Sequence, residues 1–335
     1  MKVRQVGEFG LIDIIKDNTL VDPSSVVAGI GDDTAVLKHP SGKLLLATTD
    51  MMIENIHFII SGDNGRQIGY RVMAANVSDI ASMGGRPTHA IISIGVHPDM
   101  EVSFVESVYE GMKACSRDYG VNIVGGDTVT SPDNLVLNVA LLGLVDPDKY
   151  LPRSGARPGD LVMVTNVLGD SRAGLDIVLG RCSISQEGEK YLLDRHYYSN
   201  PRVEEMAAGT ACGGITAADD ISDGLGSEIH EIADASGVGA ILKFEDLPVS
   251  DYTREVAEKT NTDLIEYCLF GGEDFEVVIT VDPRKADALA EAVESATGTK
   301  LTVVGEIVDK SEGVKLLRNN SLHVLPKKGY SHFKK

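Results

Sequence analysis

Acidic residues next to glycine or other small residues recur where apolar runs of this sequence end. The most informative is Asp79, because apolar spacing predicts an amphipathic helix over residues 66–84 that includes it. Asn76 and Asp79 are three residues apart, so both fall on or beside the apolar face of that helix. A buried ionised carboxylate needs a partner, and few basic residues lie nearby in the sequence. A divalent cation would be such a partner.

Further acidic residues of this kind would add oxygen ligands for a divalent cation. Oxygen ligands without His or Cys favour Mg²⁺, Ca²⁺ or Mn²⁺ over zinc, and Mg²⁺ commonly binds phosphate oxygens as well. The pattern therefore suggests phosphoryl chemistry, although each carboxylate taken singly is also an ordinary turn residue at a strand end. The sequence has no Walker loop and no protein-kinase signature, so metal ions would do much of the work of a P-loop lysine. These residues are Asp32, Asp33, Asp50, Asp127, Asp220, Asp223, Glu273 and Asp274.

The charge balance argues against some partners. The chain has 335 residues, with 31 basic and 50 acidic side chains and a net charge of −19. Such a field repels polyanions, so we expect no binding to nucleic acid or to an anionic membrane. The same excess suits a site that collects metal cations, and it also serves solubility alone.

The cysteines indicate a reducing compartment. The 4 cysteines are far apart and form no C-x-x-C pair, so neither a zinc site nor a disulfide framework is expected. The first residues contain no apolar signal-peptide core, and no run reaches the roughly 18 apolar residues of a membrane span. We therefore expect a soluble, cytoplasmic protein.

The elements that must position the carboxylates alternate between strands and helices, which predicts an α/β (α+β) fold with mixed sheets. The first half follows the order β-β-α-β-α-β-β. A stretch at 146–160, rich in Pro, Gly and charge, predicts a boundary between two domains, 1–147 and 148–335. Predicted strands are 26–30, 43–50, 89–96, 121–126, 135–145, 161–165, 275–281 and 301–308. Predicted helices are 66–84, 102–119, 171–180, 202–211, 226–236 and 284–296.

A set of short motifs occurs in one order along nearly the whole chain, from residue 7 to residue 333. They are "GEFGLI", "GIGDDTAVL", "TTDMMIENIHF", "NVSDIASMGGRP", "VGGDTV", "RSGARPGD", "ISDGL", "GGEDFEV" and "KKGYSHF". Together they resemble the thiamine-monophosphate kinase family, within the aminoimidazole-ribonucleotide synthetase superfamily. The resemblance implies that superfamily's two-domain fold and a homodimer whose N-terminal domains join their sheets. It also implies Mg²⁺-assisted phosphorylation of thiamine monophosphate by ATP, giving thiamine diphosphate.

The resemblance also implies roles for individual residues. The N-terminal domain would bind metal and ATP and would dimerise, and the C-terminal domain would complete the active site. No side chain is assigned as a nucleophile or general base, because an acceptor phosphate is already ionised and several Mg²⁺ ions would assist direct transfer. The metal ligands would be Asp33, Thr48, Thr49, Asp50, Asp79, Asp127, Asp220 and Asp223. ATP would contact Asp33, Gly126, Asp127, Arg153 and Ser222, and the thiamine substrate would contact His57, Glu273 and Tyr330.

Other interpretations stay open. Without the motifs, His57 is a buried core residue, Arg153 a solvated charge in a linker and Tyr330 a packing residue. Selenophosphate synthetase normally uses a reactive residue near its N-terminus, and no Cys precedes Cys115 here. The hydrogenase-maturation relative uses a C-terminal Cys, whereas this chain ends "SHFKK". Aminoimidazole-ribonucleotide synthetase itself, a non-catalytic Mg²⁺ or nucleotide-binding protein and a two-metal phosphohydrolase are the remaining alternatives.

Overall fold

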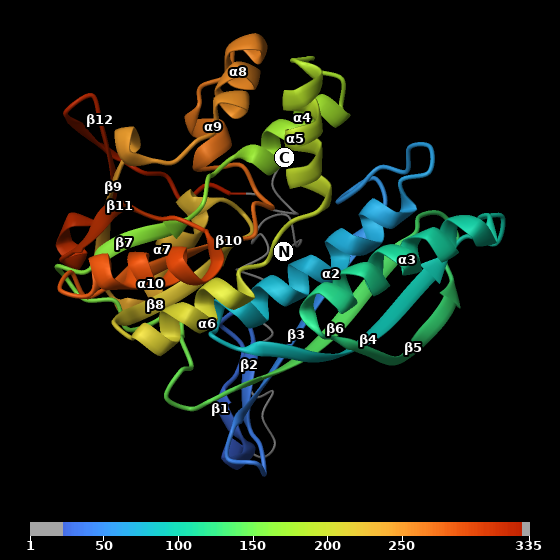
Figure 1. Ribbon diagram of the computed structural model, residues 1–335, viewed down its shortest axis with the longest axis horizontal. Coiled ribbons are helices and arrows are strands. Elements are labelled where there is room, and N and C mark those ends of the chain that lie inside the picture. The colour runs from blue at the N-terminus through green and yellow to red at the C-terminus, as the bar shows by residue number, and fades with distance from the viewer. Residues whose placement is uncertain (1–22, 330–335) are drawn as a thin grey trace, which may run out of the picture.

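The computed structural model of the protein describes residues 23–329, and their strands form two sheets with helices packed on them (Figure 1). The first sheet has the order β1-β2-β3-β6-β4-β5. β4 and β5 pair in parallel, and the other neighbours are antiparallel. Its strands are β1 (Val26–Ala28), β2 (Ala35–Lys38), β3 (Leu44–Ile53), β4 (Arg86–Val96), β5 (Asn122–Thr130) and β6 (Val136–Val145).

One face of this sheet is covered by α2 (Gly65–Ser82) and α3 (Val102–Tyr119) (Figure 1). Two glycines let these helices approach closely. A Cβ atom on Gly69 would lie 1.8 Å from the carbonyl oxygen of Val108, so no other residue fits there without moving α3. A Cβ atom on Gly111 would meet the carbonyl oxygen of Arg66 at 1.9 Å. This packing holds α2 against β3, where the predicted ligand Asp79 is needed.

The second sheet has the order β13-β12-β9-β11-β7-β10-β8 and is covered on both faces. In β7, Val162 and Val164 pack in the core under α7, whereas Met163 packs in the core under α6 and α10. Its strands are β7 (Leu161–Thr165), β8 (Ile215–Ile221), β9 (Gly239–Lys243), β10 (Glu276–Val281), β11 (Leu301–Val308), β12 (Val314–Arg318) and β13 (Ser321–Val324).

The remaining helices cover this sheet or stand beside it. α4, α5, α8 and α9 share a separate small core and lie together at the top of Figure 1. None of the described helices is both long and apolar enough to cross a bilayer. The helices are α4 (Asp170–Val178), α5 (Gln186–Tyr197), α6 (Val203–Cys212), α7 (Leu225–Ser236), α8 (Asp251–Thr260), α9 (Ile265–Cys268) and α10 (Ala286–Thr297), with 3₁₀ turns at Pro23–Ser25, Phe244–Asp246 and Lys310–Glu312.

The predicted fold class is confirmed, since both sheets are mixed and carry helices on their faces. The helix predicted over 102–119 is α3, and the one predicted over 66–84 is α2. The predicted strand order of the first half was incomplete, because β2 is an additional short strand. β8 was also missed: its sequence, ITAADDI, contains an acidic pair that is unusual in a strand. Further missed elements are α5, α8, α9, β9, β12 and β13.

Candidate active site

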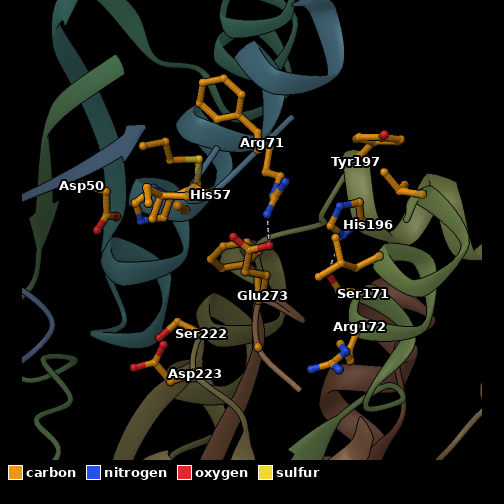
Figure 2. Close-up of a pocket in the computed structure, with 18 of the residues that line it drawn as sticks. Asp50, His57, Arg71, Ser171, Arg172, His196, Tyr197, Ser222, Asp223 and Glu273 are labelled. Atoms are coloured by element: carbon orange, nitrogen blue, oxygen red, sulfur yellow. Dashed lines mark hydrogen bonds and ion pairs between the residues drawn. The ribbon is translucent and has the colours of Figure 1, made fainter. Parts of the chain in front are cut away.

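A pocket of about 780 Å³ lies between β3 and α2 on one side and α4, α5 and the loops following β8 and preceding β10 on the other. Figure 2 shows Asp50 and Asp223 on one side of it and Arg172 and His196 on the other, with Glu273 between them. The walls thus come from both halves of the sequence. The lining combines carboxylates, basic side chains and apolar side chains.

Carboxylates from separate segments of the chain form an acidic cluster next to this pocket. Asp50 and Asp79 line the pocket itself. The hydroxyl of Thr48 donates to Oδ2 of Asp79 at 2.5 Å and so ties β3 to α2. One carboxylate oxygen from each of Asp33, Asp219 and Asp220 lies within 4.8 Å of an oxygen of the other two. The members of the acidic cluster are Asp33, Asp50, Asp79, Asp219 and Asp220.

Burial and mutual repulsion raise the pKa values in the acidic cluster. Burial, followed by the nearby charge of Asp33, raises the pKa of Asp50 to about 6. Burial, followed by Asp50, Asp220 and Asp33, raises the pKa of Asp79 well above its ordinary value. Burial is also the largest cause of the raised pKa values of Asp219 and Asp220. At neutral pH such a cluster must hold protons or a cation.

Arg153 is the basic side chain that contacts the acidic cluster among the described residues. Its Nε donates to Oδ1 of Asp219 at 2.9 Å, and its Nη2 forms an ion pair with Asp33. Its Nη1 lies 3.5 Å from Glu231. The side chain is only 18% exposed, so Arg153 is not the solvated linker charge of the alternative interpretation. Its predicted contact with ATP stays a prediction.

The predicted substrate contacts His57 and Glu273 both line the pocket (Figure 2). The backbone N–H of Ile53 donates to Nδ1 of His57 at 2.9 Å, so a neutral imidazole carries its proton on Nε2. Ser222 and Asp223, predicted to contact the nucleotide and the metal, line the same pocket. The structure therefore brings predicted residues from both halves of the chain to one place.

The position of Glu273 depends on contacts from several elements. Arg71 of α2 forms an ion pair with its carboxylate (Figure 2). The backbone of Glu273 has a φ of 65°, and its N–H donates to the carbonyl oxygen of Ser222 at 2.6 Å. The neighbouring carboxylate of Asp274 accepts the N–H of Gly169 at 2.7 Å. These contacts hold a non-glycine residue in the left-handed region, which is uncommon and typical of functional loops.

Thr49 is not brought to the acidic cluster. Successive side chains of a strand point to opposite faces, so Thr49 points away from the face that Thr48 and Asp50 share. Its hydroxyl donates to the carbonyl oxygen of Val139 at 3.0 Å. Its role as a metal ligand stays a prediction.

Gly126 and Asp127 also lie away from the acidic cluster. They belong to β5, an edge strand that β6 and β4 separate from β3. At the usual strand spacing this separation is about 14 Å along the sheet. Their assignment to metal and nucleotide stays a prediction. Tyr330 lies outside the described residues.

Sequence reasoning missed several residues that the structure places in or beside the cluster. Ser78 and Ser82 of α2 donate their hydroxyls to Asp220 at 2.7 Å and to Asp33 at 2.5 Å. The available signal was their position, because they flank Asp79 on a helix that is buried almost all round. Asp219 directly precedes the predicted ligand Asp220, and this acidic pair inside β8 is the sequence signal that could have identified it.

A serine and a histidine on the opposite side of the pocket were missed as well. Oγ of Ser171 and Nδ1 of His196 are 3.1 Å apart (Figure 2). Burial, followed by the charge of Arg71, lowers the pKa of His196 well below its ordinary value, so the ring is neutral. These residues come from α4 and α5, and no spacing in the sequence connects them.

Family models and known proteins match the chain over nearly its full length. The model for the N-terminal domain of AIR synthase related proteins matches residues 31–145, and the model for the C-terminal domain matches residues 157–316. The "Thiamine-monophosphate kinase" of Bacillus subtilis (strain 168) is 35% identical over 333 residues, which is 98% of this chain and 99% of the relative. The protein of that name from Aquifex aeolicus (strain VF5) is 36% identical, covering 99% of this chain and 100% of the relative.

Solved structures agree with these matches. The structure of "AaThiL complexed with AMPPCP and TMP" is 35% identical in sequence, with a TM-score of 0.85 and 99% of each chain covered. The E. coli hydrogenase maturation protein HypE is 21% identical with a TM-score of 0.71, covering 95% of this chain and 97% of that one. At that identity it shares the fold alone. The predicted two-domain superfamily fold is confirmed by these findings.

Proposed function

The chain belongs to the thiamine-monophosphate kinase family, and we propose that it transfers the γ-phosphoryl group of ATP to thiamine monophosphate, giving thiamine diphosphate. The observation that carries this proposal is the pocket in which carboxylates from both halves of the chain meet basic and apolar side chains. Phosphoryl transfer between two anions needs positive charge and alignment at one end, and an organic acceptor needs a specific cavity at the other. A relative of this family has been solved with AMPPCP and TMP, which supports the pairing of nucleotide and acceptor.

The side chains of the acidic cluster fit Mg²⁺. They offer carboxylate oxygens without sulfur or imidazole, and Oδ2 of Asp219 is buried with no hydrogen-bond partner among the described residues. We propose that Asp33, Asp50, Asp79, Asp220 and Asp223 hold the ions, as the motifs implied. When bound, Mg²⁺ supplies charge neutralisation between the two reacting phosphates.

The residues of the chain itself hold and orient the groups around this reaction. Thr48 fixes the carboxylate of Asp79 by its 2.5 Å hydrogen bond. Arg71 holds Glu273 at the pocket, where an ionised carboxylate accepts hydrogen bonds from a bound organic group. His57 presents an Nε2 proton when its ring is neutral. We propose that Glu273 and His57 bind the thiamine portion and that neither accepts the phosphoryl group.

Direct transfer without a phosphoenzyme is the mechanism we propose. Ser171 beside neutral His196 is the hydroxyl in the pocket that a covalent mechanism would use. Incubation with γ-labelled ATP and Mg²⁺ separates the two mechanisms. We expect label in thiamine diphosphate when thiamine monophosphate is present, and no label on the protein when it is absent. Kinetically competent label on Ser171 would overturn direct transfer.

The activity itself is tested by incubating the protein with ATP, Mg²⁺ and thiamine monophosphate and separating thiamine diphosphate by chromatography. Excess chelator should abolish the product and added Mg²⁺ should restore it. Unphosphorylated thiamine should be a very poor acceptor, because its hydroxyl is not ionised. Phosphate release to water without formation of thiamine diphosphate would favour the two-metal phosphohydrolase instead. ATP bound without any turnover would favour the non-catalytic alternative.

We propose that the face of the first sheet that no described helix covers packs against a second copy of the chain. Met51 and Ile91 lie on that sheet and are 52% and 47% exposed. Val124 and Val129 on the edge strand β5 are 58% and 55% exposed. An exposed edge beside apolar side chains is a surface that pairs or is covered. Sedimentation equilibrium should give twice the chain mass, and Val129→Lys should lower it.

Two further expectations stay proposals. We propose the domain boundary at 147/148, within the stretch 146–160 that connects β6 to β7. We propose the cytoplasm as the location, on the ground of the scattered cysteines and the chemistry of a biosynthetic kinase.

A further inference from the structure

Asp219 is a buried carboxylate with an N–H donor on one of its two oxygens among the described residues. It lies on β8, and its side chain is 0% exposed. Oδ1 accepts a hydrogen bond from Nε of Arg153 at 2.9 Å. Oδ2 is buried with no N–H or hydroxyl donor among residues 23–329, and the carboxyl group of Asp33 lies within hydrogen-bond reach of Asp219, a contact that needs a shared proton or a cation. A buried carboxylate oxygen without a hydrogen-bond partner costs folding free energy, and a bound ligand would remove that cost.

The nearest carboxylates are held in fixed positions around Asp219. One oxygen from each of Asp33, Asp219 and Asp220 lies within 4.8 Å of the others. The hydroxyl of Ser82 donates to Asp33 at 2.5 Å, and the hydroxyl of Ser78 donates to Oδ2 of Asp220 at 2.7 Å. These donors restrict the rotation of the carboxylates before any ligand arrives. Preorganised carboxylate oxygens at this separation match the coordination of one divalent cation.

When these carboxylates are ionised, their charges do not balance without such a ligand. In the ionised state the group formed by Asp33, Asp219 and Asp220 has one guanidinium, that of Arg153, within ion-pair distance among the described residues. Two negative charges then remain in a buried site, which a divalent cation would neutralise.

Asp176 provides the contrast, because it is equally buried and also bonded to an arginine. Nη1 of Arg181 donates to Oδ1 of Asp176 at 2.7 Å, and the hydroxyl of Tyr267 donates to Oδ2 at 2.7 Å. Both of its oxygens are satisfied within the protein, so Asp176 has no oxygen waiting for a ligand. The open Oδ2 of Asp219 is therefore not a general feature of buried aspartates in this chain.

We propose that Asp219 is a direct ligand of a divalent cation shared with Asp33 and Asp220, while Arg153 holds its other oxygen. The motifs assigned the cation to Asp33 and Asp220, and Asp219 adds a third carboxylate at the same ion. The choice of Mg²⁺ as the ion rests on the proposed function. The proposal that these three residues bind a divalent cation is independent of the proposed function.

The test measures Mn²⁺ binding by electron paramagnetic resonance on the full chain, without nucleotide or thiamine phosphate. Asp219→Asn should lose one tightly bound ion or bind it about tenfold more weakly. Asp176→Asn is the matched control and should bind Mn²⁺ like the unaltered protein. Mn²⁺ binding by Asp219→Asn that equals the control would overturn the proposal. A protein that binds Mn²⁺ through Asp219 but forms no thiamine diphosphate would overturn only the proposed function.

A second measurement on the unaltered protein removes any dependence on how the variant folds. Fe²⁺ with ascorbate and peroxide cuts a polypeptide next to the bound metal. We expect cuts close to residues 219–220 and 33, and excess Mg²⁺ should suppress them. Cuts confined to the chain around Asp50 and Asp79 would place the ion away from Asp219 and overturn the proposal.

Discussion

Two buried groups of charges in this molecule differ in how far arginines compensate their carboxylates. In the first, the acidic cluster, several carboxylates share the guanidinium of Arg153, the one such group in contact with them within residues 23–329. In the second, one carboxylate, Glu276, accepts hydrogen bonds from Arg202 at 2.6 Å and from Arg195 at 2.5 Å. The hydroxyl of Thr165 adds a further bond to Glu276 at 2.6 Å. Among the described residues, the acidic cluster has one guanidinium group for several carboxylates, whereas two guanidinium groups contact Glu276 and also pair with Asp170 and Glu205.

The pKa values of the carboxylates in the two groups reflect the arginines around them. Burial alone would raise the pKa of Glu276, but Arg202 and Arg195 outweigh it and hold that pKa below its ordinary value. In the acidic cluster burial and repulsion act in the same direction, and the pKa of Asp50 rises to about 6. A buried carboxylate therefore does not by itself mark a functional site. A shortage of compensating positive charge around a buried carboxylate indicates a functional site.

The largest expected effect is the loss of activity in Asp79→Asn. This change keeps the shape of the side chain and removes one ligand charge, so turnover of thiamine monophosphate should fall about a thousandfold, or about 4 kcal/mol in activation free energy. The free energy of unfolding in metal-free buffer should stay within about 1 kcal/mol or rise, because one repelling charge is gone. Steady-state kinetics and urea unfolding measure the two quantities. Turnover equal to the unaltered protein would mean that Asp79 is only a helix residue.

Glu276→Gln should have the reverse profile and lose stability. Removing this charge leaves Arg195 and Arg202 buried without it, and breaking such a buried pair costs about 3 kcal/mol of unfolding free energy. Urea unfolding at pH 7, with and without Mg²⁺, measures the loss, which should be equal in both conditions. A loss below about 1 kcal/mol, or one that Mg²⁺ repairs, would remove the distinction between the two groups.

Glu273 represents an intermediate case, with one arginine and a pocket beside it. Arg71→Met should weaken the hold on Glu273 and raise the KM for thiamine monophosphate about tenfold, or about 1.4 kcal/mol, with little change in the KM for ATP. Arg66→Met is the control, because Arg66 lies on the same helix with an exposed side chain. Equal KM changes for both substrates would indicate a general disturbance of α2 instead.

The smallest expected effect is the pH dependence of stability without metal. The pKa of Asp50 rises from 3.8 to about 6, so the folded state binds more protons than the unfolded state between these values. Stability from this group is therefore present at low pH and falls as pH rises from about 4 to about 6. A shift of this size corresponds to at most about 3 kcal/mol, and the partial exposure of Asp50 reduces it to the order of 1 kcal/mol. Urea unfolding in chelator, compared between Asp50→Asn and the unaltered protein, isolates the contribution. A difference between them that does not change across this range would contradict the assignment.

The prediction from sequence was strongest where a signal is local. The spacing of Phe104, Val108, Met112, Cys115 and Tyr119 predicted the helix 102–119, and the structure has α3 at those bounds. Asn76 was predicted on the buried face of its helix and is fully buried. β8 was missed because acidic residues are depleted in strands, and here the function of the site overrides that preference.

The site was predictable in its residue types and only partly in its membership. Asp33, Asp79 and Asp220 were recognised through motifs and lie together in the acidic cluster. Arg153 was in doubt, because a charge in a Pro- and Gly-rich connection is usually solvated. Asp219 is paired with Arg153, 66 residues away in the sequence, and no local pattern reports such a contact.

The sequence by itself determined the alternation of helices and strands, the supply of carboxylates beside glycines and the family. These depend on periodicity over a few residues and on motifs that are read along the chain. Only the tertiary structure decided which carboxylates meet, which oxygens of theirs find donors and how many guanidinium groups lie among them. Those facts depend on the packing of α2 between β3 and β8, which joins residues far apart in the sequence. Coulomb energy depends on distance in space, so the balance of charge that marks the site exists only in the folded chain.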